Sequence, residues 1–287
     1  MKGDKHMRFM VSLASLLAMS VVLTGAGAAA PGTYVSHDKV NRTFGKRGPG
    51  NDGVIADSPA KVRGNLRTGP GEAEVHENEI DVFYVVDGGS TIVTGGTVIG
   101  GKTTAPGEIK GSGIQGGKTY QLTKGDVMVI PAGVPHWHKE VSSSIAYYTV
   151  KVPKNLANGP ATEAVYVGHE EVAKAFGKRV PGNEGKIVRT PVQVIGNYDD
   201  GKREPESHDN LMDVVLVIDG SSTYVSGGTL VGIKKKGPIV NFGTDIQGGQ
   251  TVQLTKGDVI IVPAQSPHWS KDIPKSITWM TVKIPKK

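Results

Sequence analysis

The feature that most constrains this chain is a gapless internal repeat. The stretch "HENEIDVFYVVDG" beginning at His76 returns as "HDNLMDVVLVIDG" beginning at His208, an offset of 132 residues that other matching stretches share without insertion. A repeat of this length indicates two copies of one structural unit. We therefore expect two domains, 31–153 and 166–287, joined by a linker at 154–165.

Composition and turn spacing favour β structure in both copies. The 287 residues include 40 glycines, and short apolar runs such as "DVFYVVDG" and "VMVIPAG" alternate with Gly-rich turns. Short strands with turns every eight to twelve residues or so are typical of sandwiches and barrels. The stretches "SHDKVNRTFG" and "GHEEVAKAFG" each predict one short helix, with Ser36 as N-cap and Gly45 as C-terminal stop in the first copy. We predict an all-β protein with one short N-terminal helix in each half.

The first 30 residues form a separate segment. Basic residues precede an apolar run from about 9 to 23, and the small residues "GAGAAA" follow. This order is typical of a secretory signal peptide, and the apolar run is short for a membrane span, although a retained anchor is the alternative. We expect residues 1–30 to be a signal peptide and the protein to be periplasmic or secreted. Because the lysines of the chain are scattered, we expect no nucleic-acid partner, and no membrane contact after cleavage.

Two acidic residues and two histidines recur at the same spacing in both copies. They are Glu74, His76, Asp81 and His136 in the first copy and Glu206, His208, Asp213 and His268 in the second. Residues two apart on a strand face the same side, and a barrel could bring each set of four to one inward point. Imidazoles and carboxylates together suit Mn, Fe, Ni, Cu or Zn. We predict a divalent transition metal at each set, against the alternative of a hydrogen-bonded cluster without metal.

These spacings resemble those of the cupin family. "GDVMVIPAGVPH" fits the second cupin motif, from Gly125 to His136, although Gln265 replaces the motif glycine in the second copy. The first motif normally reads His-x-His, three or four residues, Glu, six residues, Gly. Here Glu74 replaces the first His and Asp81 replaces the Glu. The resemblance covers nearly everything after the leader and implies a bicupin, with a double-stranded β-helix (cupin or jelly-roll) barrel in each half and a metal at the matching positions.

The two copies differ near the predicted metal sites. His138 lies two residues beyond His136 and corresponds to Ser270, while Glu108 corresponds to Val240. An imidazole or carboxylate beside a metal-bound substrate can move a proton. We therefore predict His138 and Glu108 as catalytic residues of the first barrel, with a rim histidine in contact with solvent as the alternative for His138.

Two classes of function fit these residues. The first is an exported metal-dependent cupin enzyme that acts on a small oxygen-rich substrate (an organic acid, sugar acid or phenolic), by proton transfer or O2 chemistry in barrel 1. Known cupins include decarboxylases, dioxygenases, isomerases and lyases, and the fold does not choose among them. The second is a non-catalytic periplasmic bicupin that binds a metal or small ligand. The second copy has Ser270 where the first has His138, and this difference favours the enzyme. The duplication also fits a monomer whose two barrels pair within one chain.

Overall fold

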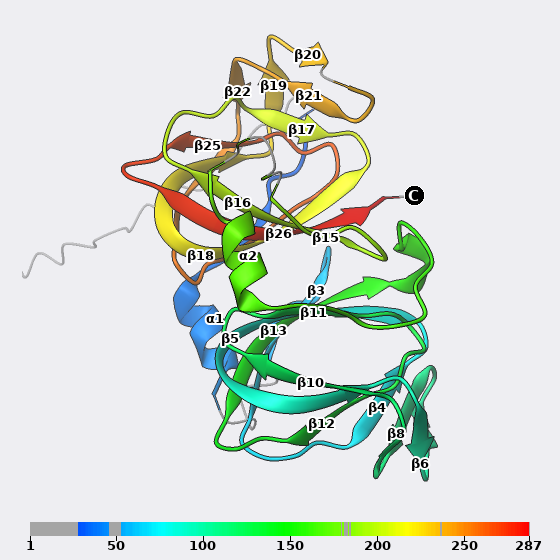
Figure 1. The fold of residues 1–287 in the computed structure, drawn as a ribbon. Coiled ribbons are helices and arrows are strands. Elements are labelled where there is room, and N and C mark those ends of the chain that lie inside the picture. Colours follow the sequence, from blue (N-terminus) through cyan, green and yellow to red (C-terminus); the bar gives the residue numbers. More distant parts are fainter. Residues whose placement is uncertain are drawn as a thin grey trace, which may run out of the picture.

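The protein is described by a computed structural model over part of its length. The described residues are 28–45, 53–178, 180, 183, 185–235 and 237–286. Residues 1–27 of the predicted signal peptide therefore lie outside them. Within these ranges no helix is both long and apolar enough to cross a membrane. The expected all-β architecture is confirmed, with one short helix near the start of each half (Figure 1).

The first half folds into one large antiparallel sheet that curls on itself. Its central order is β2-β3-β13-β5-β12-β4-β8-β7, with β10 and β11 paired to β5 and a small separate sheet of β6 and β9. The strands are β2 (Val54–Ala56), β3 (Lys61–Arg67), β4 (Ala73–His76), β5 (Glu79–Thr94), β6 (Thr97–Ile99), β7 (Lys102–Ala105), β8 (Glu108–Gly111), β9 (Gly113–Gln115), β10 (Lys118–Thr123), β11 (Val127–Ile130), β12 (His136–Glu140) and β13 (Ile145–Pro153). The long strand β5 bends through both walls, which closes the barrel.

The second half repeats this topology strand for strand. Its order is β15-β16-β26-β18-β25-β17-β21-β20, with β23 and β24 paired to β18 and a small sheet of β19 and β22. The strands are β15 (Lys186–Val188), β16 (Gln193–Asp199), β17 (Glu206–His208), β18 (Leu211–Ser226), β19 (Thr229–Val231), β20 (Lys234–Lys235), β21 (Val240–Phe242), β22 (Asp245–Gln247), β23 (Gln250–Thr255), β24 (Val259–Val262), β25 (His268–Asp272) and β26 (Ile277–Pro285). A short 3-10 helix, Lys154–Leu156, follows the first half.

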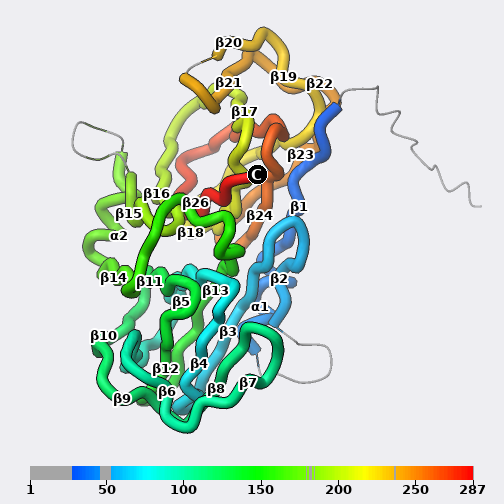
Figure 2. The backbone as a smooth tube through the Cα atoms, turned by 90° about the vertical axis from the view of Figure 1, so that its right-hand side faces the viewer, coloured from blue at the N-terminus to red at the C-terminus, as the bar shows by residue number. Residues whose placement is uncertain are grey.

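Each half lends one strand to the other. Strand β1 (Thr33–Val35), from the start of the chain, pairs antiparallel with β24 of the second barrel. Strand β14 (Val165–Val167), from the start of the second copy, pairs in the same way with β11 of the first barrel. Figure 2 shows β1 lying along β24 before the chain returns to the first barrel. The two barrels are therefore joined by a reciprocal strand exchange.

The helix that follows each exchanged strand begins on an aspartate of the opposite half. Helix α1 (His37–Thr43) has Ser36 at its N-cap position, but the Ser36 side chain makes no capping bond, so the expected cap is wrong in mechanism. Instead the backbone N–H of His37 donates to Asp258 at 2.6 Å, and the carboxylate is fully buried. Helix α2 (His169–Ala175) is held identically by Asp126, also at 2.6 Å. Each helix N-terminus thus receives the negative charge it favours from the other barrel.

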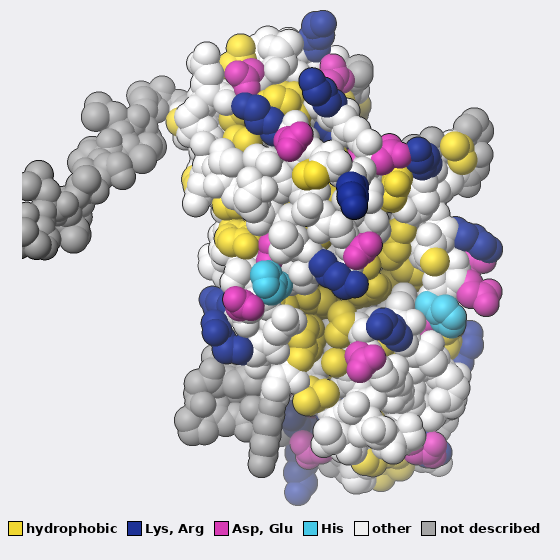
Figure 3. All heavy atoms as spheres, turned by 90° about the vertical axis from the view of Figure 1, so that its left-hand side faces the viewer, with side chains coloured by type: hydrophobic (Ala, Val, Ile, Leu, Met, Phe, Trp, Pro, Cys, Tyr) yellow, Lys and Arg dark blue, Asp and Glu magenta, His cyan; other side chains and the backbone are white. Residues whose placement is uncertain are grey.

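Apolar side chains fill the junction between the barrels. One continuous cluster contains Val82 and Val150 from the first half together with Val214, Leu216 and Val282 from the second. Each barrel also has its own smaller interior cluster. Figure 3 shows apolar side chains gathered midway along one face, where the two halves meet. The polar groups described below share each barrel interior with these apolar side chains.

Candidate metal centre

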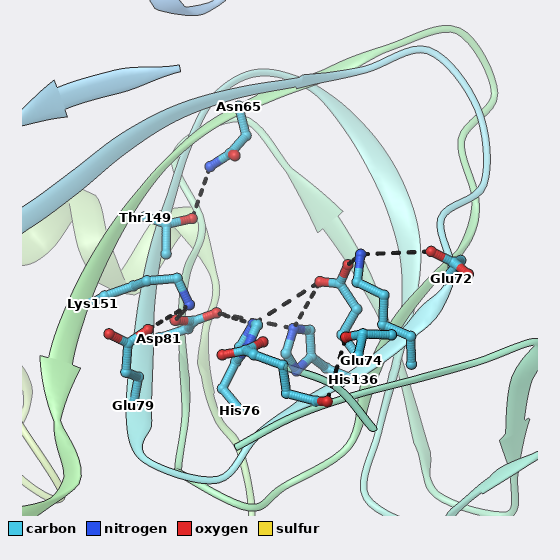
Figure 4. A network of polar contacts seen from close by, with 12 residues as sticks. Asn65, Glu72, Glu74, His76, Glu79, Asp81, His136, Thr149 and Lys151 are labelled. Carbon is cyan, nitrogen blue, oxygen red and sulfur yellow. Dashed lines mark hydrogen bonds and ion pairs between the residues drawn. The ribbon is translucent and has the colours of Figure 1, made fainter. Parts of the chain in front are cut away.

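Strand register places the four predicted ligands of the first half together. Glu74 and His76 share one face of β4, and Glu74 is paired directly with His136 of β12. Asp81 lies near the start of β5, the strand that follows β4 along the chain. Figure 4 shows these four side chains converging from separate stretches of chain on one region inside the barrel.

The donor atoms of Glu74, His76 and His136 all lie within 4.8 Å of one another, close enough to share one cation, and Asp81 lies beside the two histidines. His76 Nε2 lies 3.4 Å from Asp81 Oδ2 and 4.0 Å from Glu74 Oε2. His136 Nε2 lies 3.9 Å from Glu74 Oε2 and 4.0 Å from Asp81 Oδ2. Ligands bonded at about 2.1 Å to one metal lie roughly 3–4 Å from each other. The first-half residues therefore fit a divalent transition metal.

Glu108 contacts the cluster through a histidine. It lies directly opposite His76 in the β4–β8 pair, and its Oε2 is 2.5 Å from His76 Nδ1. A carboxylate at Nδ1 fixes the tautomer whose Nε2 lone pair is free and makes that nitrogen a stronger ligand. This position gives Glu108 an orienting role towards His76, whereas the sequence-based prediction gave it a proton-transfer role.

Burial and charge keep the two key groups of the cluster in metal-binding protonation states. Burial lowers the pKa of His136, although the Asp81 and Glu74 carboxylates oppose it, so the ring is neutral near pH 7. Burial alone would raise the pKa of Glu74, but electrostatic interactions with His136, Arg67 and Lys110 lower it overall. A neutral imidazole and an ionised carboxylate are both competent ligands.

The cavity around the cluster is lined by cationic groups that sequence reasoning missed. It has a volume of about 130 Å³, and its lining includes Arg63, Arg67 and Lys151. Arg67 Nε donates to the Tyr147 hydroxyl at 3.0 Å, and Lys151 Nζ donates to Asp81 Oδ1 at 2.9 Å. The period-two alternation of β3 and β13 could have pointed these residues inward, but a lysine or arginine on a strand is usually exposed.

His138 lies in the same cavity rather than at its rim. Only 2% of the residue is exposed, so the alternative of a rim histidine in contact with solvent is wrong. Its Nδ1 lies 2.8 Å from Ser90 Oγ, and its ring stacks on Phe83. Its Nε2 has no partner among the described residues. Burial, and then electrostatic interactions with Arg67 and His136, hold its pKa well below 6.5, so the ring is neutral at pH 7.

The second half contains an equivalent cluster with different neighbours. His268 Nε2 lies 3.6 Å from Glu206 Oε1, and His208 Nε2 lies 3.3 Å from Asp213 Oδ2. Burial acts against protonation of His268, but the carboxylates of Glu206 and Asp213 outweigh it and raise the pKa. Among the described residues the chain thus holds two His/Glu clusters able to bind a metal.

Two tandem barrels, each with an imidazole–carboxylate cluster inside, define the cupin class of protein. Residues 66–179 match the family described as Cupin. This match lies mostly in the first half, and the second half repeats the same barrel topology. No curated protein matches the sequence.

Solved structures with this architecture have diverged far in sequence. The chain is similar to a salicylate 1,2-dioxygenase from Pseudaminobacter salicylatoxidans, with a TM-score of 0.53, 13% identity and coverage of 88% of this chain and 84% of that one. It is also similar to a mutant oxalate decarboxylase from Bacillus subtilis, with a TM-score of 0.46, 12% identity and coverage of 98% and 86%. A third similar structure is a cupin 2 conserved barrel domain protein from Leptotrichia buccalis, with a TM-score of 0.47, 13% identity and coverage of 80% of this chain and 86% of that one. At these identities the first of them supports the fold alone.

Proposed function

We propose that the protein is an exported metal-dependent cupin enzyme whose first barrel acts on a small, oxygen-rich anion. The observation that carries the proposal is one cavity that combines the metal-competent cluster with Arg67. A guanidinium binds a carboxylate through two parallel hydrogen bonds. The second barrel has Asp199 at the position of Arg67, and the arginine that lines its cavity, Arg203, comes from a different position in the repeat. The basic, apolar and small-residue order of the leader supports export to the periplasm or beyond.

The residues around the cavity have separable roles in this proposal. Arg67, held through Nε by Tyr147, anchors the anionic end of the substrate. A divalent metal bound by the cluster would supply Lewis-acid activation of a substrate oxygen. His138 presents a neutral Nε2 that can exchange a hydrogen bond or a proton with the bound substrate, because Ser90 fixes the ring through Nδ1. Because its pKa is low, the His138 ring is a weak base. It is therefore suited to accept a substrate proton that the metal has already made acidic.

The reaction is tested with the purified mature chain, its metal content and a panel of small carboxylates, sugar acids and phenolics that includes salicylate. We expect turnover that His136→Ala abolishes together with the tightly bound metal. Arg67→Gln should raise KM by about 10- to 100-fold, since a charged hydrogen bond is worth about 1.5–3 kcal/mol. The matched control is Arg203→Gln, which removes the same charge from the second cavity and should leave KM unchanged.

His138→Ala separates catalysis from metal binding. It should retain the metal and lose most of kcat, whereas unchanged turnover would remove His138 from the proposal. Metal binding without turnover on any panel member would favour the alternative, a periplasmic module that binds a metal or small ligand.

A further inference from the structure

We infer that the two clusters form a high-affinity and a low-affinity metal site, and that Lys283 sets the difference by occupying the second cluster. Lys283 Nζ lies 3.0 Å from His208 Nε2 and 2.8 and 2.9 Å from the two oxygens of Asp213. His208 Nε2 is one of the donors of the second metal-capable group, and Asp213 lies beside it. The ammonium group is therefore a built-in competitor for the cation.

The equivalent lysine of the first barrel is held away from the histidines. Lys151 contacts Asp81 only through Oδ1 and extends to Glu79 Oε2 at 3.3 Å. Asp81 Oδ2 remains directed at His76 Nε2. Both lysines lie opposite their aspartates in the same strand register, so backbone position does not explain the difference. Figure 4 shows Lys151 between Glu79 and Asp81.

The cause is a substitution at the start of the long strand. Glu79 of the first barrel, which also pairs with Lys61, corresponds to Leu211 in the second. Without that carboxylate, Lys283 satisfies its three donors on Asp213 and His208. The two lysines occupy equivalent positions in the repeat but have opposite roles. Lys151 contacts Asp81 from outside the cluster, whereas Lys283 occupies the second cluster.

The histidines reinforce the difference. His76 Nδ1 contacts the Glu108 carboxylate, whereas His208 Nδ1, opposite Val240, is buried and has no partner in the described part of the chain. The second histidine of each cluster shows the opposite pattern. His268 Nδ1 contacts the Ser266 carbonyl, whereas His136 Nδ1 has no partner among the described residues. A carboxylate nevertheless strengthens a ligand more than a carbonyl does, and loss of such a partner typically lowers metal affinity about 10- to 100-fold. We expect the first site to bind at least about 100-fold more tightly than the second.

The test is equilibrium dialysis of the chelator-treated chain against Zn²⁺ and, separately, Mn²⁺, with metal per chain measured by mass spectrometry. The unmodified chain should bind one tight equivalent, which His136→Ala removes and His268→Ala leaves. Lys283→Met should raise the affinity of the second equivalent at least tenfold, and His268→Ala should remove that gain. Lys256→Met is the matched control: it deletes one exposed positive charge of the same half and should change neither affinity.

Leu211→Glu keeps Lys283 in place and tests the same cause by a second route. It should draw the ammonium away as Glu79 does and strengthen the second site, with thermal unfolding checked for every variant. Equal affinities in the unmodified chain, or a second site that neither variant strengthens, would overturn the inference. The inference rests on the proposed function only for the first site. A chain that binds no metal tightly contradicts the proposed function. The role of Lys283 is decided separately, by whether Lys283→Met binds an additional metal that is lost when His268 is also replaced.

Discussion

At the scale of single residues, the turn before the last ligand of each barrel shows how one position affects the site. Gly133 and Gln265 occupy equivalent places with φ of 82° and 69°. Their backbone N–H groups donate to the carbonyl oxygens of His76 and His208, at 2.8 and 2.7 Å. The turn therefore ties the second motif to the first in each barrel, and in the second barrel it does so in a conformation that a side chain disfavours.

This strain predicts opposite effects of exchanging the two residues. Gln265→Gly should raise the free energy of unfolding by about 1 kcal/mol, because glycine adopts positive φ without steric cost. Gly133→Gln should lower it by about the same amount, since no atom lies within 4 Å of a Cβ built there and strain alone decides the outcome. Urea unfolding of both variants measures these changes. A less stable Gln265→Gly variant would contradict the strain argument.

Glu206 predicts a specific acid sensitivity. Burial opposes its ionisation, but the nearby His268, His208 and Arg203 lower its pKa from 4.5 to about 2. A depressed pKa stabilises the folded chain above pH 4.5 and loses that effect as the pH falls towards 2. Between pH 6 and pH 3 the loss is about 2 kcal/mol.

The acid sensitivity is measured by comparing unfolding free energies at the two pH values. Glu206→Gln should reduce the difference between them by that amount, whereas Glu77→Gln, on an exposed side chain, should leave it unchanged. An unaltered pH dependence in Glu206→Gln would show that the carboxylate is not held ionised by its neighbours.

At the scale of secondary-structure elements, the helix-capping aspartates connect the barrels. Asp258 accepts hydrogen bonds from the His37 N–H, the Tyr34 hydroxyl at 3.2 Å and the Thr255 N–H at 2.8 Å. All three donors lose their partner together if the carboxylate is removed. The bond from His37 and the bond from Tyr34 cross between halves, so the capping aspartate contributes to the association of the barrels as well as to the helix.

We expect Asp258→Ala and Asp126→Ala each to destabilise the protein by about 2–4 kcal/mol, from a lost cap and buried donors left unpaired. Because the two environments repeat, the two losses should be similar. Asp87→Ala, on an exposed residue of the first barrel, is the control and should change stability by less than about 0.5 kcal/mol. A loss below 1 kcal/mol for both buried aspartates would mean that solvent or other groups replace the cap.

At the scale of the whole molecule, the repeat and the cupin spacing predict the fold and the convergence of the four ligand positions. They do not predict the strand exchange, because β1 and β14 have nearly the same sequence and would fit either barrel equally well. They also do not predict Arg67 or the two lysines. Strand residues of that type are usually solvent-exposed, and the contrast between Lys151 and Lys283 depends on Glu79 and Leu211, whose side chains matter only once the barrel brings them together.

The exchanged strands also bear on the origin of the chain. A single-copy ancestor that exchanged this strand would complete its sheet by binding a second molecule. The rate and extent of that association would depend on the protein concentration. Fusion of two copies makes that encounter internal, where a short tether gives a local concentration in the millimolar range. Dilution then no longer dissociates the pair, and each copy can accept substitutions that its twin does not share, as the residues around the two lysines have done.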